Sequence, residues 1–464
     1  MKIRNKTLYS KVKNFVFSAI KLLKKLASKE ALPVQQITRY SFKKNIGYSK
    51  DEELEVDFFL FIFRHMDEID KLPDFKECAK YILKNPVTRR ATGWRTKDGQ
   101  PAKDLPLKLD CFRILYSLLG IYLKRVRKFS FVESEFKETY MEFEKYGYKS
   151  IVSYRLTAPL QGLSGSIGEV NFGNTLKLRR ILDSEKAAYL QAVTEPFGIP
   201  SSFGFLDITE VEYTLETIYS HRKDTAINTS SCRKGFEDIV TTLRLFKSGR
   251  FGFDVIKTET TSWAPHAHTS YGWGPSRQDL ILRGFYDLDK SEKPGLLRLW
   301  RRFKSFKKAA GSSQDGKHIS LALKRFNFGV EESDAENRII DFFVAFEALC
   351  LPERDELTYR LSNRVAIMLG KNDEEADSIR EFMTKAYRLR SEIVHGGEVK
   401  PITIKGETVN VNDTAQRIEK YLRETLKFVL VLSKKYKKRE RIMALLDKSL
   451  IDTKIRRQLR KLKL

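Results

Sequence analysis

The sequence has few cysteines, and none of them stands in a pairing pattern. Its four cysteines are spread over 464 residues, at Cys78, Cys111, Cys232 and Cys350. Disulfide frameworks and structural zinc sites both rely on closely spaced cysteines, such as the pair in C-x-x-C. The absence of such pairs argues against both kinds of site and favours a reducing compartment. We therefore expect a cytoplasmic protein.

Long apolar runs are also absent. No stretch reaches the roughly 20 apolar residues that a membrane-spanning helix needs. The short apolar patch at residues 15–20 is interrupted by Lys21, and no small-residue cleavage site follows it, so we predict no signal peptide. The sequence also lacks G-x-S-x-G, H-E-x-x-H and the Gly-Lys-Ser/Thr of a phosphate loop. The sequence therefore offers no motif that would indicate a serine hydrolase, a zinc protease or a P-loop nucleotide hydrolase.

Positive charge, in contrast, is abundant and lies mainly at the two ends. The formal net charge is +26; residues 1–50 carry 13 Lys and Arg against one acid, and residues 431–464 carry 13 against three. The middle of the chain is nearly balanced as a result. Basic ends favour polyanionic partners such as RNA, DNA or an anionic membrane surface, and charge alone does not choose among them.

The basic N-terminal segment, residues 1–50, predicts an amphipathic helix over residues 2–30. Apolar residues such as Leu8 and Phe15 recur at helical spacing, lysines fill most of the other positions, and Pro33 ends the pattern. A helix of this kind can lie on a membrane or on nucleic acid. It can equally pack on the body of the protein, and the sequence leaves these alternatives open.

Residues 51–310 predict a mixed α/β region, for which we expect a recognition or regulatory role. Helical patterns dominate up to residue 128, and strand and turn patterns then alternate with helical ones. The expected strands cover 150–156, 169–178 and 250–256, and the expected helices cover 184–193 and 236–246. The sequence does not fix the topology of this region.

Two histidines of this region, His266 and His268, stand in a loop between Trp263 and Trp273. Alternate histidines can bind a metal ion, but no third ligand lies near them in the sequence. We therefore predict no metal site.

A basic and aromatic stretch at residues 296–310 allows two interpretations. Six basic side chains stand among three aromatic ones: Arg298, Arg301, Arg302, Lys304, Lys307 and Lys308, with Trp300, Phe303 and Phe306. Aromatic rings interleaved with cations can stack on single-stranded RNA and neutralise it. The interpretation we favour is an amphipathic helix whose rings face the core. Arg301, Arg302 and Lys304 remain candidates for RNA contact.

The next segment, residues 317–440, predicts an all-α bundle of four helices with short links, which favour antiparallel neighbours. Capping boxes and glycines mark the helix ends: Ser333 with Glu336, Asn372 with Glu375, Gly370, Gly396 and Gly397. The expected helices cover 333–349, 356–369, 372–395 and 413–430. The predicted fold class is therefore α+β, a mixed α/β region followed by an all-α bundle, and residues 441–464 form a basic C-terminal tail.

One arginine interrupts the apolar face of the third of these helices. Apolar residues from Ile379 to Ile393 follow helical spacing, and Arg390 lies in the same line. A buried arginine is costly unless it is paired. His395 follows at the helix end, where the last carbonyls favour a protonated imidazole. A histidine that moves protons and an arginine that stabilises charge at phosphorus together suit RNA cleavage without a metal.

An acid likewise interrupts the apolar face of the first helix of the bundle. Glu347 lies in line with apolar residues such as Val344. We expect it to pair with an arginine of the bundle, and Arg360, Arg364 and Arg390 are the candidates. The interpretation we favour for Glu347 is a structural ion pair without a catalytic role.

The segment from Arg390 to His395 has the R-x4-H form of the HEPN nuclease motif. Its setting, Tyr-Arg-Leu-Arg-Ser-Glu-Ile-Val-His-Gly at 387–396, resembles the ApeA-like branch of that superfamily. Residues 337–349 are similar to the first long helix of that branch, and residues 356–361 are similar to its second. The N-terminal region resembles the variable sensor portions of such proteins only loosely.

The resemblance implies a HEPN four-helix bundle and a metal-independent endoribonuclease without a cofactor. It implies a homodimer in which two R-x4-H helices face each other and form one composite site. It also implies a toxin or anti-phage abortive-infection effector that cleaves cellular RNA, with a phage or regulatory trigger acting at the N-terminal region. The alternative is an inactive HEPN module that binds RNA or a partner.

Two further residues are supporting candidates. Ser391 stands after the arginine, where the superfamily often has Asn, Asp or His, and a serine can still donate a hydrogen bond. Arg388 fits a looser R-x6-H pattern with His395, because residues seven apart share a helical face and residues five apart do not. We prefer Arg390 because Arg388 lies off the apolar stripe.

Overall fold

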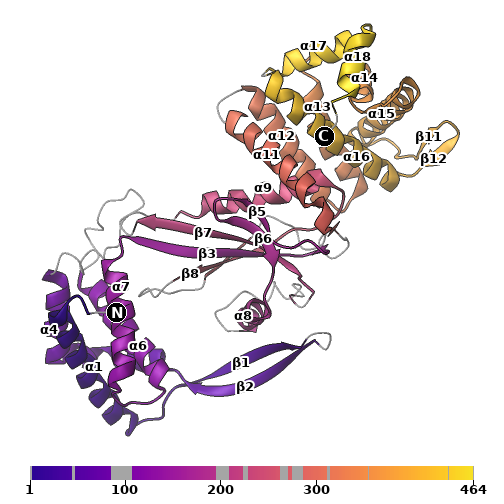
Figure 1. Ribbon diagram of the computed structural model, residues 1–464. Coiled ribbons are helices and arrows are strands. Elements are labelled where there is room, and N and C mark those ends of the chain that lie inside the picture. Colours follow the sequence, from indigo (N-terminus) through magenta and orange to yellow (C-terminus); the bar gives the residue numbers. More distant parts are fainter. Residues whose placement is uncertain are drawn as a thin grey trace.

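A computed structural model arranges the chain in three units that follow the sequence order (Figure 1). The structure describes residues 3–43, 47–84, 107–194, 208, 210–222, 228–261, 270–273, 286–310, 314–353, 355–436 and 438–462. A helical unit leads into an antiparallel sheet and then into a second helical unit. The predicted combination of α and β structure with a helical C-terminal region is confirmed.

The N-terminal unit is a group of helices around one apolar core, with a long hairpin extending from it. Its helices are α1 (Lys6–Ala27), α2 (Phe58–Arg64), α3 (Met66–Asp70), α4 (Pro73–Lys84), α6 (Leu107–Val126) and α7 (Glu133–Tyr148). The hairpin pairs β1 (Val34–Lys43) with β2 (Gly47–Val56) in antiparallel fashion. Its strand β1 contacts α8 (Asp183–Thr194) of the next unit (Figure 1).

Helix α1 is amphipathic, and its apolar face is buried in the core of this unit. Phe15 and Leu23 are fully buried, together with side chains from α4, α6 and α7. The carboxylate of Glu144 in α7 accepts the Asn5 N–H at 2.8 Å, which holds the start of the helix. Packing on the body of the protein is therefore the arrangement that α1 adopts. The boundary that we predicted at residue 50 does not separate two units, because α1 and the later helices share one core.

The central unit is built on a six-stranded antiparallel sheet with the order β5-β6-β7-β3-β8-β9. Its strands are β3 (Ile151–Leu160), β5 (Val170–Gly173), β6 (Leu176–Arg180), β7 (Tyr213–Arg222), β8 (Val255–Thr260) and β9 (Ser270–Trp273). Two short parallel strands, β4 (Leu163–Ser164) and β10 (Tyr286–Asp287), pair separately. The predicted strand at 169–178 is the β5–β6 hairpin, and the strand predicted at 250–256 begins only at Val255. Strand β7, which lies between β6 and β3 in the middle of the sheet, was not predicted from the sequence.

The two faces of this sheet differ in character. Apolar side chains of the strands, such as Leu156 and Leu215, belong to a core that includes residues of α9 (Ser230–Phe246) and α11 (Lys293–Ala310). The opposite face carries buried polar residues such as Thr157 and Lys257 and meets α8, where the Tyr189 hydroxyl lies 3.1 Å from the Thr157 hydroxyl. The apolar face therefore packs against α9, which lies between β7 and β8 in the chain, and against α11, which follows the sheet.

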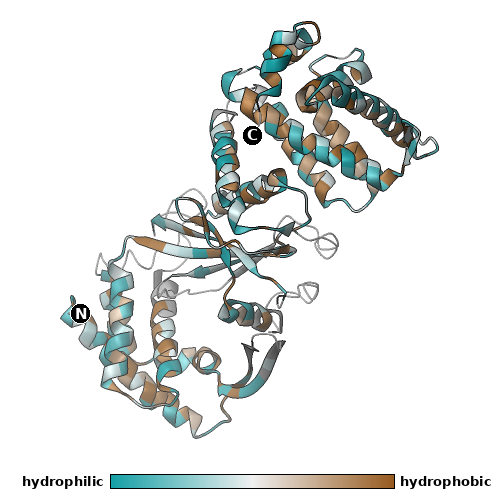
Figure 2. Cartoon of the chain, turned by 45° about the vertical axis from the view of Figure 1, so that its right-hand side comes forward, coloured by the Kyte–Doolittle hydropathy of each residue, from teal (hydrophilic) through white to brown (hydrophobic). Residues whose placement is uncertain are grey.

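The C-terminal unit is helical apart from one short hairpin. It contains α12 (Gln314–Glu331), α13 (Ala335–Cys350), α14 (Leu357–Leu369), α15 (Asp373–Val394), β11 (Ile402–Ile404), β12 (Glu407–Val409), α16 (Val411–Lys435), α17 (Arg439–Ser449) and α18 (Thr453–Arg460). The four predicted helices are α13 to α16, and α12 is an additional long helix beside α13. Hydrophilic and hydrophobic residues alternate around these helices, as amphipathic packing requires (Figure 2).

The start of α13 differs from the prediction by one residue. Asp334 caps the helix by accepting the Asn337 N–H at 2.9 Å, whereas the Ser333 N–H donates to Glu332. Either aspartate or serine can cap a helix, so two such residues in succession leave the cap position ambiguous in the sequence. The cap of α15 is as predicted, since Asn372 accepts the Glu375 N–H at 2.8 Å.

The described residues of the predicted basic tail, 441–462, do not form a free tail. They contribute most of α17 and the whole of α18, and apolar side chains of both helices, such as Leu446 and Leu459, are buried. From α17, the Asp447 carboxylate accepts two hydrogen bonds from Arg364 of α14, at 2.9 and 2.7 Å. The prediction of a tail was wrong because the many lysines and arginines conceal an apolar stripe at helical spacing.

We expect Asp447→Ala to lower the free energy of unfolding by about 1–3 kcal/mol, because it leaves donors of a buried guanidinium without their acceptor. Urea unfolding followed by circular dichroism measures this change. Glu440→Ala, an exposed change on the same helix, serves as the control. Equal stability of the two variants would contradict the role of Asp447.

Candidate functional site

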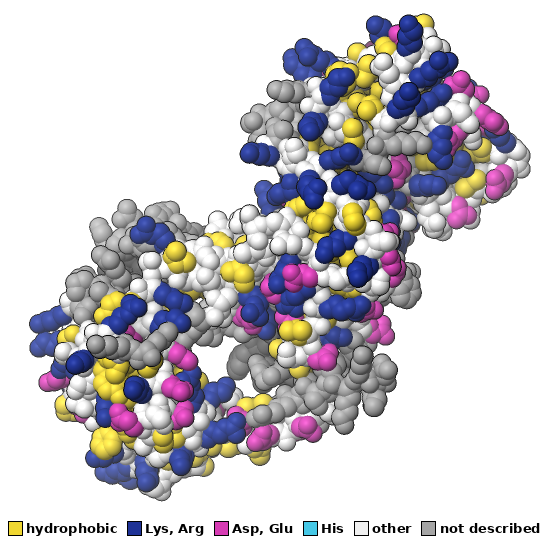
Figure 3. Space-filling model, viewed as in Figure 1, with side chains coloured by type: hydrophobic (Ala, Val, Ile, Leu, Met, Phe, Trp, Pro, Cys, Tyr) yellow, Lys and Arg dark blue, Asp and Glu magenta, His cyan; other side chains and the backbone are white. Residues whose placement is uncertain are grey.

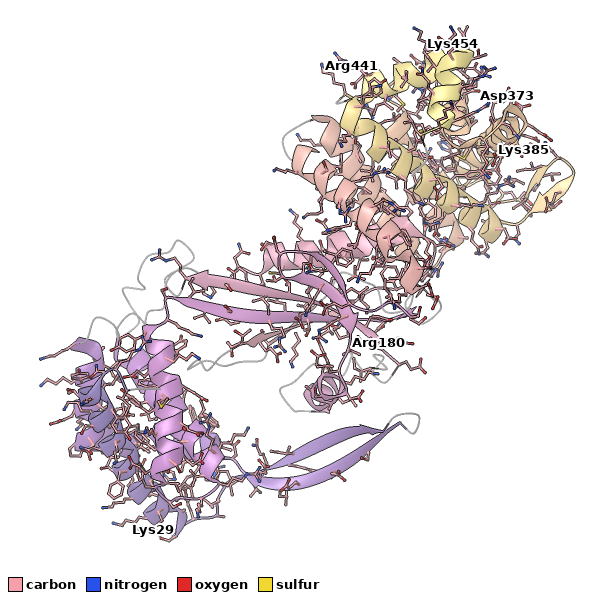
Figure 4. The ribbon with its side chains drawn as sticks, in the orientation of Figure 1. Lys29, Arg180, Asp373, Lys385, Arg441 and Lys454 are labelled. Carbon is pink, nitrogen blue, oxygen red and sulfur yellow. The ribbon has the colours of Figure 1, made fainter. Side chains whose placement is uncertain are left out.

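Helix α15 carries the residues of the R-x4-H motif near its C-terminal end. Asp373 and Lys385, both labelled in Figure 4, mark its first residue and its middle. The helix ends with His395 as the cap and Gly396 in the left-handed region, at φ +72°. A glycine adopts this φ without the steric cost that other residues meet, so the predicted stop at this position has a physical basis.

Arg390 of α15 forms an ion pair with Glu347 of α13. The Arg390 Nη2 atom lies 3.4 Å from Glu347 Oε1, and the two side chains are 22% and 27% exposed. Of the other two candidates, Arg360 pairs with Glu356, and Arg364 pairs with Glu353 and Asp447. The prediction that Glu347 pairs with an arginine of the bundle is confirmed, and the arginine is the one in the motif.

Tyr387 completes this cluster. Its hydroxyl donates to Glu347 Oε1 at 3.0 Å, and its ring lies edge-on to Phe343 with centroids 5.3 Å apart. Burial, together with the Glu347 carboxylate, raises the pKa of Tyr387 to about 12, so the phenol keeps its proton at neutral pH. We had not assigned Tyr387 a role, although its position three residues before Arg390 places both on neighbouring turns of one helical face.

The guanidinium of Arg390 retains hydrogen-bonding capacity. An arginine side chain offers five N–H donors, and the Glu347 contact is long and involves one nitrogen. The Arg390 Nε atom is buried and has no hydrogen-bond partner. A partly exposed guanidinium with unused donors is suited to binding an anion such as a phosphate group.

No described contact joins the His395 side chain to this cluster. His395 is exposed, and among the described contacts only its backbone N–H takes part, donating to the Ser391 carbonyl at 3.0 Å. Ser391 itself is half-buried, whereas Arg388 is exposed, as expected for a residue off the apolar stripe. The structure thus brings together Glu347, Tyr387 and Arg390, and it leaves the imidazole facing solvent.

The aromatic residues of α11 face the core, which agrees with the interpretation that we favoured. Trp300, Phe303 and Phe306 are buried, and the Trp300 indole N–H donates to the Phe172 carbonyl at 2.6 Å. These rings are therefore not accessible to RNA bases in the folded protein, and the alternative that RNA stacks on them is wrong. The candidate residues Arg301, Arg302 and Lys304 of α11 are exposed. Their contact with RNA stays a prediction.

The described residues contain no group of three or more metal-binding side chains that could hold an ion. His266 and His268 lie outside the described residues. None of the helices in the described ranges is both long and apolar enough to cross a membrane.

Comparison with protein-family models, with curated proteins and with solved structures gave no match.

We expect Glu347→Ala and Arg390→Ala to be coupled by about 0.5–1 kcal/mol in a double-mutant cycle, the range of partly exposed ion pairs. Urea unfolding of the two single variants and the double variant gives this coupling energy. The matched control is the cycle of Glu347→Ala with Arg388→Ala, for which we expect no coupling because Arg388 points to solvent. A coupling of Glu347 to Arg388 as large as its coupling to Arg390 would contradict the assigned pair.

Proposed function

We propose that the protein is a metal-independent endoribonuclease of the HEPN type that acts in the cytoplasm on cellular RNA. The observation that carries this proposal is the state of Arg390, a guanidinium held by Glu347 with a buried Nε that has no partner. It lies one turn before a helix end that carries an exposed histidine. An anion-binding arginine and a titratable imidazole on one helix supply the two functions that RNA cleavage needs.

In the proposed reaction, the ribose 2′-oxygen attacks the adjacent phosphorus, and the bond to the 5′-oxygen of the next nucleotide breaks. The His395 imidazole removes the proton of the 2′-hydroxyl or donates one to the leaving 5′-oxygen. Arg390 stabilises the negative charge that develops on the phosphoryl oxygens, and Glu347 with Tyr387 positions its guanidinium. The products are a 2′,3′-cyclic phosphate and a 5′-hydroxyl end.

The proposed site is composite and forms in a homodimer. No described contact joins the His395 imidazole to Arg390, whereas a two-fold pairing of α15 helices would add a second copy of both residues to one cleft. Val394, next to the histidine, is an apolar residue with 47% of its surface exposed, which supports a partner at this end of the helix.

We also propose a biological role for this activity. The protein would act as a toxin or an anti-phage abortive-infection effector, and a trigger would act on its N-terminal region.

The alternative proposal is an inactive HEPN module that binds RNA or a protein partner. The observation that favours it is the exposed imidazole, which has no described side-chain partner to orient it. Catalytic histidines are commonly oriented by a second group. The effect of replacing His395 distinguishes the two proposals.

We expect His395→Ala to reduce RNA cleavage by about 10²–10⁴-fold, the usual contribution of general acid–base catalysis, while its circular dichroism stays unchanged. Cleavage by the unaltered protein should persist in EDTA, and DNA of the same sequence should remain intact. Arg380→Ala, which removes an exposed arginine nearer the start of the same helix, is the control and should cleave normally.

Wild-type activity in a folded His395→Ala variant would refute the assignment. Activity that depends on a divalent metal would place the chemistry elsewhere in the chain. RNA binding without any cleavage would favour the alternative proposal.

We also expect a dimer at micromolar concentration, measured by light scattering. Val394→Arg should yield monomers and abolish cleavage, because it places a charge where the two α15 helices would meet. Ile451→Arg, at a site that is 91% exposed between α17 and α18, should change neither property. A monomeric unaltered protein that still cleaves RNA would exclude the composite site.

A further inference from the structure

The last three helices of the chain enclose a groove of about 450 Å³ that the proposed ribonuclease does not use. Its walls are mainly apolar and come from α16, α17 and α18, through residues such as Leu432, Leu445 and Leu459. Three polar residues also line it: Lys434, Lys435 and Gln458. In Figure 3, hydrophobic side chains reach the surface in this region among many lysines and arginines.

The groove combines two properties that select one class of ligand. Its volume lies within the roughly 300–1,000 Å³ that small-molecule sites usually have. Lys434 and Lys435 are exposed in the last turn of α16, and neither forms an ion pair with a carboxylate of the described residues. A ligand with an apolar body and one anionic group would match both the walls and the lysines.

The surroundings strengthen the preference for an anion. Residues 431–464 hold 13 Lys and Arg against three acids. Of these acids, Asp447 already accepts hydrogen bonds from Arg364, and Asp452 accepts the Lys454 N–H as the cap of α18. The local field around the groove is therefore strongly positive, which attracts negatively charged solutes.

We propose that this groove binds a monomeric amphiphile that has an alkyl chain and an anionic head, such as a long-chain carboxylate. The chain would lie against Leu432, Leu445 and Leu459, and the carboxylate would pair with Lys434 and Lys435. A ligand in this position bridges α16 to α17 and α18, so it stabilises the packing that also holds Asp447 near Arg364.

The test uses the full chain with dodecanoate, dodecyltrimethylammonium or buffer alone, each below its micellar concentration. Dodecanoate should raise the Tm, because a ligand that binds only the folded state stabilises it. The cationic amphiphile should not raise it. Calorimetric titration of dodecanoate gives the Kd.

Lys434→Gln combined with Lys435→Gln should weaken dodecanoate binding by about tenfold or more, which is about 1.4 kcal/mol. Lys448→Gln combined with Lys454→Gln removes the same charge from exposed positions of α17 and α18 and should leave the Kd unchanged. Gln458→Trp should fill the groove and also abolish binding.

Three results would overturn the proposal. One is equal affinity for the anionic and cationic amphiphiles, which would indicate unspecific detergent binding. Another is an unchanged Kd in the Lys434 and Lys435 variant. The third is binding to vesicles of anionic lipid without any binding of free dodecanoate, which would make the surface a membrane contact.

Discussion

The arrangement of the C-terminal unit depends on one buried guanidinium, that of Arg364. This side chain is 1% exposed, yet it carries a full charge, and its N–H groups donate to Glu353, Asp447 and the Cys350 carbonyl. A buried arginine destabilises a protein strongly if its partners are removed. The end of α13, the helix α14 and the distant α17 therefore stay together. Because α15 packs against both α13 and α14, the position of Arg390 opposite Glu347 depends on this interaction.

Two further buried arginines, Arg244 and Arg423, connect α9 of the central unit to the helices of the bundle. The Arg423 Nε of α16 donates to the Arg244 carbonyl of α9 at 2.7 Å, and the Arg244 guanidinium pairs with Glu331 of α12 at 2.7 Å. The apolar core is continuous from the strands through α11 to α16. The sheet and the bundle therefore share one core, with α9 and α11 packed between them.

The sequence predicted those parts of the fold whose determinants are local. The capping residues and the apolar stripe predicted where α15 begins and ends. Glu347 and Arg390 each interrupt an apolar helical face, and this pattern indicated that Glu347 contacts an arginine. The sequence did not reveal the partner of Arg364, because Asp447 lies 83 residues away in a stretch rich in lysine and arginine. Such pairings depend on how helices assemble, and no local periodicity encodes them.

In the proposed cleavage, the attacking group is the ribose 2′-hydroxyl, which is activated without a metal. The most direct measurement is the cleavage of two synthetic RNAs in EDTA, after mapping the cut site. They differ only in a single 2′-deoxynucleotide immediately 5′ of the bond that is cut. This one substitution should abolish cleavage at that bond and leave binding nearly unchanged, because it removes the attacking oxygen. Cleavage of both RNAs at equal rates would contradict the proposed mechanism.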